Sequence, residues 1–176
     1  MANLIKQQNI VDTSKRSLLK FVFVSDNSED ANTVLIDAST LAYSLNANGQ
    51  IMTGGTDRKS NYRTTIKRIA GTSQSNNGIA TIQWHGTAAQ TNVAIVTFGR
   101  SNKFDYDFQS MGDGATISNP NNVANTTGNV MITTAGYTAG ETFTLFVDLR
   151  KNNGDYDAGQ TADPVAFNRG PALGPQ

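Results

Sequence analysis

The 176-residue chain contains no cysteine, so disulfides, zinc-thiolate sites and cysteine nucleophiles are all excluded. Its start has no apolar stretch of signal-peptide length, and no segment approaches the roughly 18 apolar residues of a membrane span. Its 14 basic residues balance 14 acidic ones, leaving no net charge to attract nucleic acid or an anionic membrane. These absences predict a soluble protein, made in the cytoplasm, whose stability comes from packing or assembly.

The residues that are abundant favour strands over helices. Asn, Thr and Ser are frequent, whereas the helix formers Leu, Glu and Lys are scarce. A chain of this length buries roughly 70% of its unfolded surface as one domain. We therefore predict an all-β fold, a single antiparallel β-sandwich (jelly-roll or Ig-like) of about eight strands, with an N-terminal arm at 1–16, the sandwich at 17–151 and an extended C-terminal arm at 152–176.

Alternating apolar and polar residues predict where the strands lie and which of them pair. Three hairpins are expected, each from two alternating segments around a polar or glycine-rich turn. They join 17–25 to 32–37, 79–85 to 92–98, and the two halves of 128–151. Trp84 is the expected core anchor of the second hairpin.

The segment 17–25 is apolar on both faces. Alternation places two apolar sets on opposite faces of the strand. One face carries Leu19, Phe21 and Phe23, and the other face carries Leu18, Val22 and Val24. Such a strand lies centrally in a sandwich, or has one face closed by another subunit. The sequence leaves both alternatives open.

The two arms carry isolated apolar residues between polar ones. A short helix is an alternative for the first arm, and simple disorder is an alternative for the second. An extended or polyproline-like tail with apolar side chains cannot bury them within its own domain, which favours docking on a partner. The predicted partner-binding residues of the arms are Leu4, Ile5, Ile10, Val11, Val165, Phe167 and Leu173.

One cluster of basic residues stands out, formed by Arg58, Lys59, Arg63, Lys67 and Arg68. A nucleic-acid site would interleave such residues with exposed aromatics, and only Tyr62 qualifies. The cluster is a solvated strand face or, as we favour, a set of salt bridges to an acidic neighbouring subunit. Arg58 and Lys59 are therefore added to the predicted partner-binding residues.

The chain contains one histidine, His85, as a candidate catalytic base. His85 at a strand end would need Ser101 or Ser73 as a nucleophile, but the chain has no Gly-x-Ser-x-Gly elbow. A strand-end histidine without a motif is more often structural. We predict that the protein is not an enzyme and has no catalytic residues.

Two pairs of aspartates are candidates for a metal or for acid/base work. Asp105 and Asp107 share a strand face, as a depolymerase acting on a glycosidic bond would require, and Asp155 with Asp157 faintly resembles a calcium loop. Neither pair completes the Asp-x-Asp-x-Asp-Gly pattern, and turns collect Asp because its side chain caps backbone amides. We predict no metal and no cofactor.

Four pieces of the chain together resemble virion structural proteins of tailed bacteriophages. They are TSKRSLLKFVFVSD, NTVLIDASTL, NYRTTIKRIAGTSQSNNGIATIQWHGT and TTGNVMITTAGYTAGETFTLFVDLRK, and the likeness spans residues 13 to about 158. The recurring elements determine the fold more than any chemistry. The resemblance implies a β-sandwich component of the phage particle.

Within such a particle, a small, neutral, cysteine-free β domain with apolar residues in its arms fits a decoration or cement protein that clamps major capsid protein subunits from outside the head. Many copies, as homo-oligomers, would gain avidity from repeated weak contacts with the capsid and other virion subunits. A neck or tail component is the alternative in the same class. A glycan-binding virion module, with Trp84 or Tyr106 as the sugar platform, is the alternative from another class.

Overall fold

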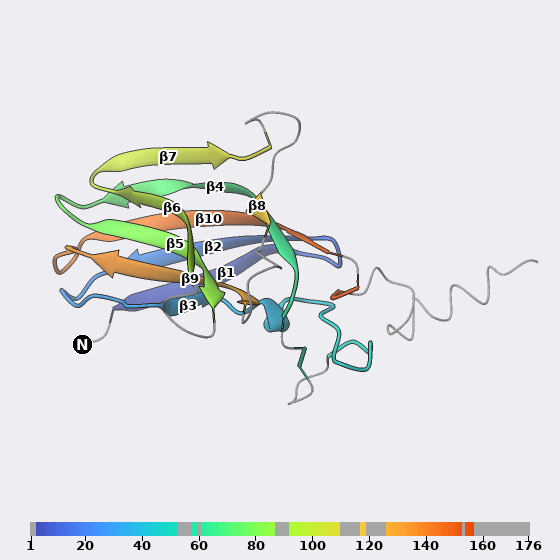
Figure 1. Ribbon diagram of the computed structural model, residues 1–176. Coiled ribbons are helices and arrows are strands. Elements are labelled where there is room, and N and C mark those ends of the chain that lie inside the picture. The colour runs from blue at the N-terminus through green and yellow to red at the C-terminus, as the bar shows by residue number, and fades with distance from the viewer. Residues whose placement is uncertain are drawn as a thin grey trace, which may run out of the picture.

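The computed structural model describes residues 3–52, 58–59, 61–86, 92–109, 117–118, 126–152 and 154–156. Within these residues, two antiparallel sheets pack face to face, as the two layers of ribbons in Figure 1 show. The prediction of an all-β sandwich is confirmed. The choice between jelly-roll and Ig-like connectivity stays a prediction.

The larger sheet has six strands in the order β1-β2-β10-β4-β7, with the short β8 paired to β4. The chain thus places its first and last strands on either side of β2. The bounds are Leu4–Asp12 for β1, Arg16–Val24 for β2, Thr64–Gln74 for β4, Asn102–Asp107 for β7, Ile117–Ser118 for β8 and Thr142–Lys151 for β10.

The smaller sheet has four strands in the order β3-β9-β5-β6. Its strands are Thr33–Ile36 for β3, Ile79–Gly86 for β5, Val93–Gly99 for β6 and Thr126–Ala135 for β9. A single 3₁₀ turn, η1 at Ala38–Thr40, follows β3. The described part of the chain includes no helix with the length and hydropathy needed to cross a membrane.

One of the three predicted hairpins is confirmed, and two are wrong. β5 and β6 pair as expected, and Trp84 is 2% exposed in the core. By contrast, β2 and β3 belong to different sheets, as do β9 and β10. Each of these connections is an arch between the two layers.

Tyr137 explains why the connection after β9 is an arch. Its ring is 4% exposed and packs edge-on against Phe23 at 5.2 Å and against Phe143 at 5.9 Å. An apolar ring inside a short connection draws that connection over the end of the core. The flanking strands therefore face each other across the core and do not pair.

The predicted N-terminal arm is part of the sheet. Residues 4–12 form β1, which pairs along β2 from Leu4 opposite Val24 to Asp12 opposite Ser17. β2 would otherwise be an edge strand with unpaired backbone groups, and β1 supplies their partners. The boundary at 16 is therefore corrected, and the described residues of this segment include no helix.

The sandwich also continues beyond the predicted boundary at 151. Tyr156 is 1% exposed, its backbone forms a bridge with Ser44, and its hydroxyl donates a 2.8 Å hydrogen bond to the carbonyl oxygen of Ala38. The first residues of the predicted C-terminal arm therefore belong to the core. The predicted binding residues Val165, Phe167 and Leu173 lie outside the described residues.

Candidate protein-binding surface and the polar end of the sandwich

The outer face of the six-stranded sheet carries apolar side chains that are only half-buried. Because β2 and β10 alternate strictly, the residues that do not enter the core point outward, and their register is continuous. The described strands form only two layers, and none of them covers this face. The half-buried apolar residues are Leu18, Val22, Val24 and Phe146.

A depression of about 290 Å³ lies on this outer face, over β2, β10 and β4. Leu18, Ala70 and Phe146 form its apolar part. Arg16 borders it and donates two hydrogen bonds of 2.9 Å to the carboxylate of Asp148. The arrangement is an apolar patch next to fixed ion pairs, which is the chemistry of a protein-binding surface.

The other border of the depression is Arg68, which forms two hydrogen bonds with Asp105. These hydrogen bonds lower the pKa of the Asp105 carboxyl, which therefore stays ionised well into acid. A carboxylate held in this way by a guanidinium is a poor general acid. The predicted acid/base pair thus has one member engaged in a structural ion pair.

The outer face is positively charged although the chain is neutral. The strand registers place six cations and three anions on it, so the face has an excess of three positive charges. An excess of this kind favours acidic partners and speeds their encounter. The cations are Lys6, Arg16, Lys20, Arg68, Lys103 and Arg150, and the anions are Asp105, Asp107 and Asp148.

The predicted binding residues of the first arm lie on β1, the edge of this same sheet. Leu4 is 48% exposed and Ile10 is 45% exposed. Ile10 is the extra residue of a β-bulge, whereas Ile5 packs against the core and Val11 is half-buried. Within the sheet, the backbone of β1 pairs on one side only, which leaves the other side open to a further strand.

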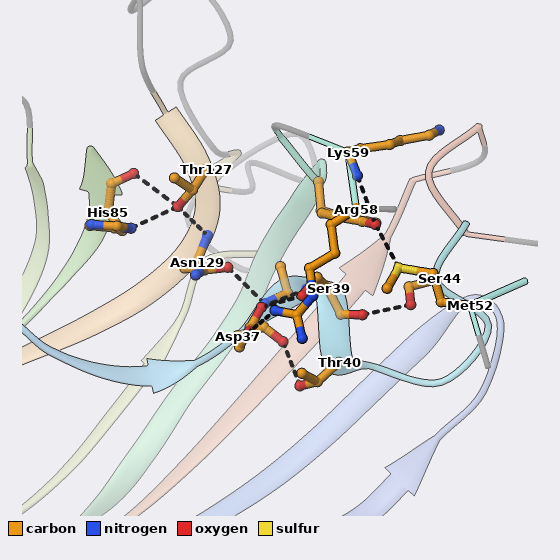
Figure 2. Close-up of polar contacts among 12 residues, drawn as sticks. Asp37, Ser39, Thr40, Ser44, Met52, Arg58, Lys59, His85, Thr127 and Asn129 are labelled. Carbon is orange, nitrogen blue, oxygen red and sulfur yellow. Dashed lines mark hydrogen bonds and ion pairs between the residues drawn. The ribbon is translucent and has the colours of Figure 1, made fainter. Parts of the chain in front are cut away.

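Arg58 and Lys59 lie elsewhere, at one end of the sandwich beside η1. They line a polar depression of about 160 Å³ together with Asp37 and Ser39. Arg58 forms a 3.0 Å ion pair with Asp37, and Lys59 forms a 3.2 Å ion pair with Asp155. Figure 2 shows the Arg58 side chain reaching down to Asp37. The charges of Arg58 and Lys59 are thus paired within the chain, and their role in binding a neighbouring subunit stays a prediction.

His85 belongs to a structural relay at the same end. Its Nδ1 lies 2.8 Å from the hydroxyl of Thr127, which accepts a hydrogen bond from the backbone of Asn129. The Asn129 side chain in turn accepts from the Ala38 amide at 2.9 Å, which ties β5 and β9 to η1 (Figure 2). The histidine therefore helps to hold the 3₁₀ turn in place.

The predicted serine partners of His85 form hydrogen bonds elsewhere. Ser73 contacts the hydroxyl of Tyr137 at 3.2 Å, and Ser101 donates to the carbonyl oxygen of Ser75 at 3.1 Å. Neither serine is brought to the imidazole. The geometry among the described residues therefore offers no serine–histidine nucleophile.

Of the second aspartate pair, only Asp155 lies among the described residues. Asp155 accepts from the backbone amide of Arg63 at 3.0 Å and from Lys59, whereas Asp157 lies outside the described residues. Across the described ranges, no three His, Asp or Glu side chains converge in a manner that could hold a metal ion. Asp155 serves to fasten the chain after β10.

Neither of the two aromatic residues considered for a sugar platform is fully exposed to solvent. Trp84 is buried in the core, and Tyr106 is half-buried beside Phe104, with 6.1 Å between ring centroids. Among the described residues, Tyr43 is an exposed aromatic that sequence reasoning missed, at 38% exposure and with a φ of 64°. No periodic pattern marks it, because it lies in the irregular segment after η1.

Sequence reasoning also missed a buried ion pair. The side chain of Lys151 has 0% exposure and contacts Asp12, whose side chain is 13% exposed. Burial lowers the pKa of the Lys151 ammonium, and its hydrogen bond with Asp12 opposes this change. The two residues are 139 positions apart, so no local pattern connects them.

The fold and these surfaces define a β-sandwich protein with an exposed, cationic, partly apolar sheet face. No protein-family model, curated protein or solved structure matches the chain. What the protein does is therefore inferred from its residues and their geometry.

Proposed function

We propose that the protein is a non-enzymatic structural protein of a tailed-phage virion, namely a decoration or cement protein that binds the outside of the capsid and stabilises it. The observation that supports this most directly is the outer face of the six-stranded sheet. Its half-buried Leu18, Val22 and Phe146 are more apolar than a solvated sheet face needs to be. The resemblance to virion structural proteins supplies the class of partner.

The depression around Ala70 fits the centre of such an interface. Protein interfaces combine an apolar centre with a charged, hydrated rim, and the ion pairs of Arg16 and Arg68 already provide that rim. Because these pairs are preformed, docking requires little ordering of long side chains. We propose that major capsid protein subunits contribute an acidic surface to this face.

The edge strand β1 extends the same surface. Leu4 and Ile10 are exposed next to backbone groups that no described strand of the sheet pairs with. A strand from a capsid subunit, or from a second copy of this protein in a homo-oligomer, would complete those hydrogen bonds. Many copies bound in this way gain avidity even when each contact is weak.

A single substitution tests the proposed face. Ala70→Arg places a long side chain over the depression, and Ile79→Arg is the matched control on the other sheet, where Ile79 is 46% exposed. We expect Ala70→Arg to weaken co-sedimentation with empty heads at least about tenfold, equivalent to ~1.4 kcal/mol, while Ile79→Arg binds normally. Thermal unfolding of both variants confirms that each is folded.

The same assay separates the alternatives. A protein that ignores empty heads but co-purifies with tails is a neck or tail component, and the capsid assignment is then wrong. A glycan array identifies a glycan-binding module, for which the structure offers Tyr43 but not Trp84. If Ala70→Arg and Ile79→Arg bind heads equally well, the interface does not lie on the outer face of the six-stranded sheet.

A further inference from the structure

The first and last strands of the six-stranded sheet place an amine against a carboxylate inside the protein. Lys151 ends β10 and Asp12 ends β1, on either side of β2. The Nζ atom of Lys151 lies 2.5 Å from Oδ1 of Asp12. With side-chain exposures of 0% and 13%, the pair is shielded from solvent.

The groups around this pair are those that an acyl-transfer step uses. The hydroxyl of Ser17 donates to the same Oδ1 that Lys151 contacts. The backbone amide of Ala42 donates to Oδ2 at 2.9 Å, and Nζ donates to the Ala42 carbonyl oxygen at 2.7 Å. The ring of Tyr156 covers the amine at 5.1 Å from its centroid. Each polar atom of the pair thus has a fixed partner.

Burial makes the charged state of the pair costly. Removing an ammonium and a carboxylate from water is unfavourable, and their mutual attraction only partly offsets this loss of solvation. Desolvation favours the neutral amine of Lys151, and one proton moved from Nζ to Oδ1 along the existing hydrogen bond produces it. A neutral lysine in such surroundings is a nucleophile.

We propose that Lys151 and Asp12 condense spontaneously into an isopeptide bond that joins β10 to β1. The Nζ lone pair attacks Cγ of Asp12, and the developing negative charge falls on Oδ2, where the Ala42 amide donates. Ser17 relays a second proton from Nζ to Oδ1, the Cγ–Oδ1 bond breaks, and water leaves. One ammonium and one carboxylate become one amide and one water, without an oxidant or a cofactor.

The product fits the same surroundings as the reactants. The amide N–H retains the Ala42 carbonyl oxygen as its acceptor, and the amide oxygen retains the Ala42 N–H as its donor. No charge then remains buried between β1 and β10. The link would close most of the chain into one covalent loop, which stabilises the fold by restricting the unfolded state as a disulfide does. This chain has no cysteine with which to form a disulfide.

Intact mass spectrometry of the denatured full-length protein tests the proposal. We expect a mass lower than that of the sequence by one water, about 18 Da. Trypsin should then release the segment 7–15, which contains Asp12, joined to the segment 151–169, because a modified Lys151 is not cleaved. Tandem mass spectrometry of this branched peptide locates the bond.

Matched variants separate this bond from other losses of water. Lys151→Arg and Asp12→Ala should show the full mass, whereas Lys20→Arg, on the outer face of β2, should retain the loss. Asp12→Asn should lose ammonia, about 17 Da, and yield the same branched peptide. Ser17→Ala should slow the appearance of the linked form.

The mass of the wild-type protein tests the isopeptide bond even where a variant fails to fold. Full mass after prolonged incubation of the folded wild-type protein would overturn the proposal and leave a buried ion pair. A loss of water without the branched peptide would overturn it as well, since an aspartyl succinimide explains such a loss.

Discussion

At the scale of single residues, Gly128 shows how tightly the polar end of the sandwich is packed. Its φ of +82° is a conformation that other residues adopt only with strain. A Cβ at this position would lie 1.8 Å from the carbonyl oxygen of Tyr62. The side chain of any other residue would therefore push β9 away from the segment that leads into β4.

We expect Gly128→Ala to lower the free energy of unfolding by more than ~2 kcal/mol, because backbone strain and a clash with main-chain atoms add together. Gly140→Ala is the matched control, with a φ of +84° and no atom within 4 Å of the added Cβ. It should cost about 1 kcal/mol through strain alone. Urea unfolding measures both, and equal losses would show that the contact with Tyr62 is unimportant.

At the scale of elements, the chain after β10 is fastened by the side chains of Tyr156 and Asp155. Tyr156 follows the strand by five residues, and its ring packs against Tyr62 at 5.8 Å between centroids while its hydroxyl bonds to Ala38. Asp155 beside it holds Lys59. This short segment closes the end of the core and anchors η1 together with the relay from His85.

Two truncations test where the folded element ends. A chain that stops at residue 158 retains Tyr156 and should keep the melting temperature of the full chain while binding phage heads more weakly. A chain that stops at 151 loses a buried aromatic and should be destabilised by about 3 kcal/mol or more. Thermal unfolding distinguishes them. Equal melting temperatures of the two truncated chains would contradict the role of Tyr156. Unchanged head binding by the chain that stops at residue 158 would argue against a docking tail.

At the scale of the whole molecule, buried tyrosines set an alkaline limit to stability. Burial raises the pKa of Tyr62, Tyr137 and Tyr156 above the ordinary value of 10.0. Above pH 10 the unfolded chain therefore releases protons that the folded protein retains. Stability falls as the pH rises wherever the folded state binds more protons.

We expect the free energy of unfolding to fall steeply above about pH 10.5, by up to ~1.4 kcal/mol per pH unit for each tyrosine. An unlinked Lys151 has the opposite sign because its pKa is lowered, but its contribution ends near the ordinary lysine pKa of about 10.4. Denaturant unfolding from pH 8 to about 11.5 gives the slope. Tyr137→Phe should reduce that slope, and an unchanged slope would contradict the assignment.

Much of the fold follows from the sequence alone. A period of two distinguishes core residues such as Phe21 and Trp84 from outward ones such as Leu18, and the apolar outward residues of β2 already indicated a face that another subunit could close. Leu4 and Ile10 are exposed, and their role as binding residues stays a prediction. These properties depend on neighbours in the sequence, which is why the sequence determines them.

Only the tertiary structure decided which strands pair. Alternation indicates which side of a strand faces the core but does not identify its neighbour, so an arch around Tyr137 and a hairpin have the same pattern. Residues 4–12 became an edge strand because β2 had an unpaired side. The meeting of Asp12 with Lys151 was decided in the same way, because 139 residues separate them and only the strand order brings them into contact.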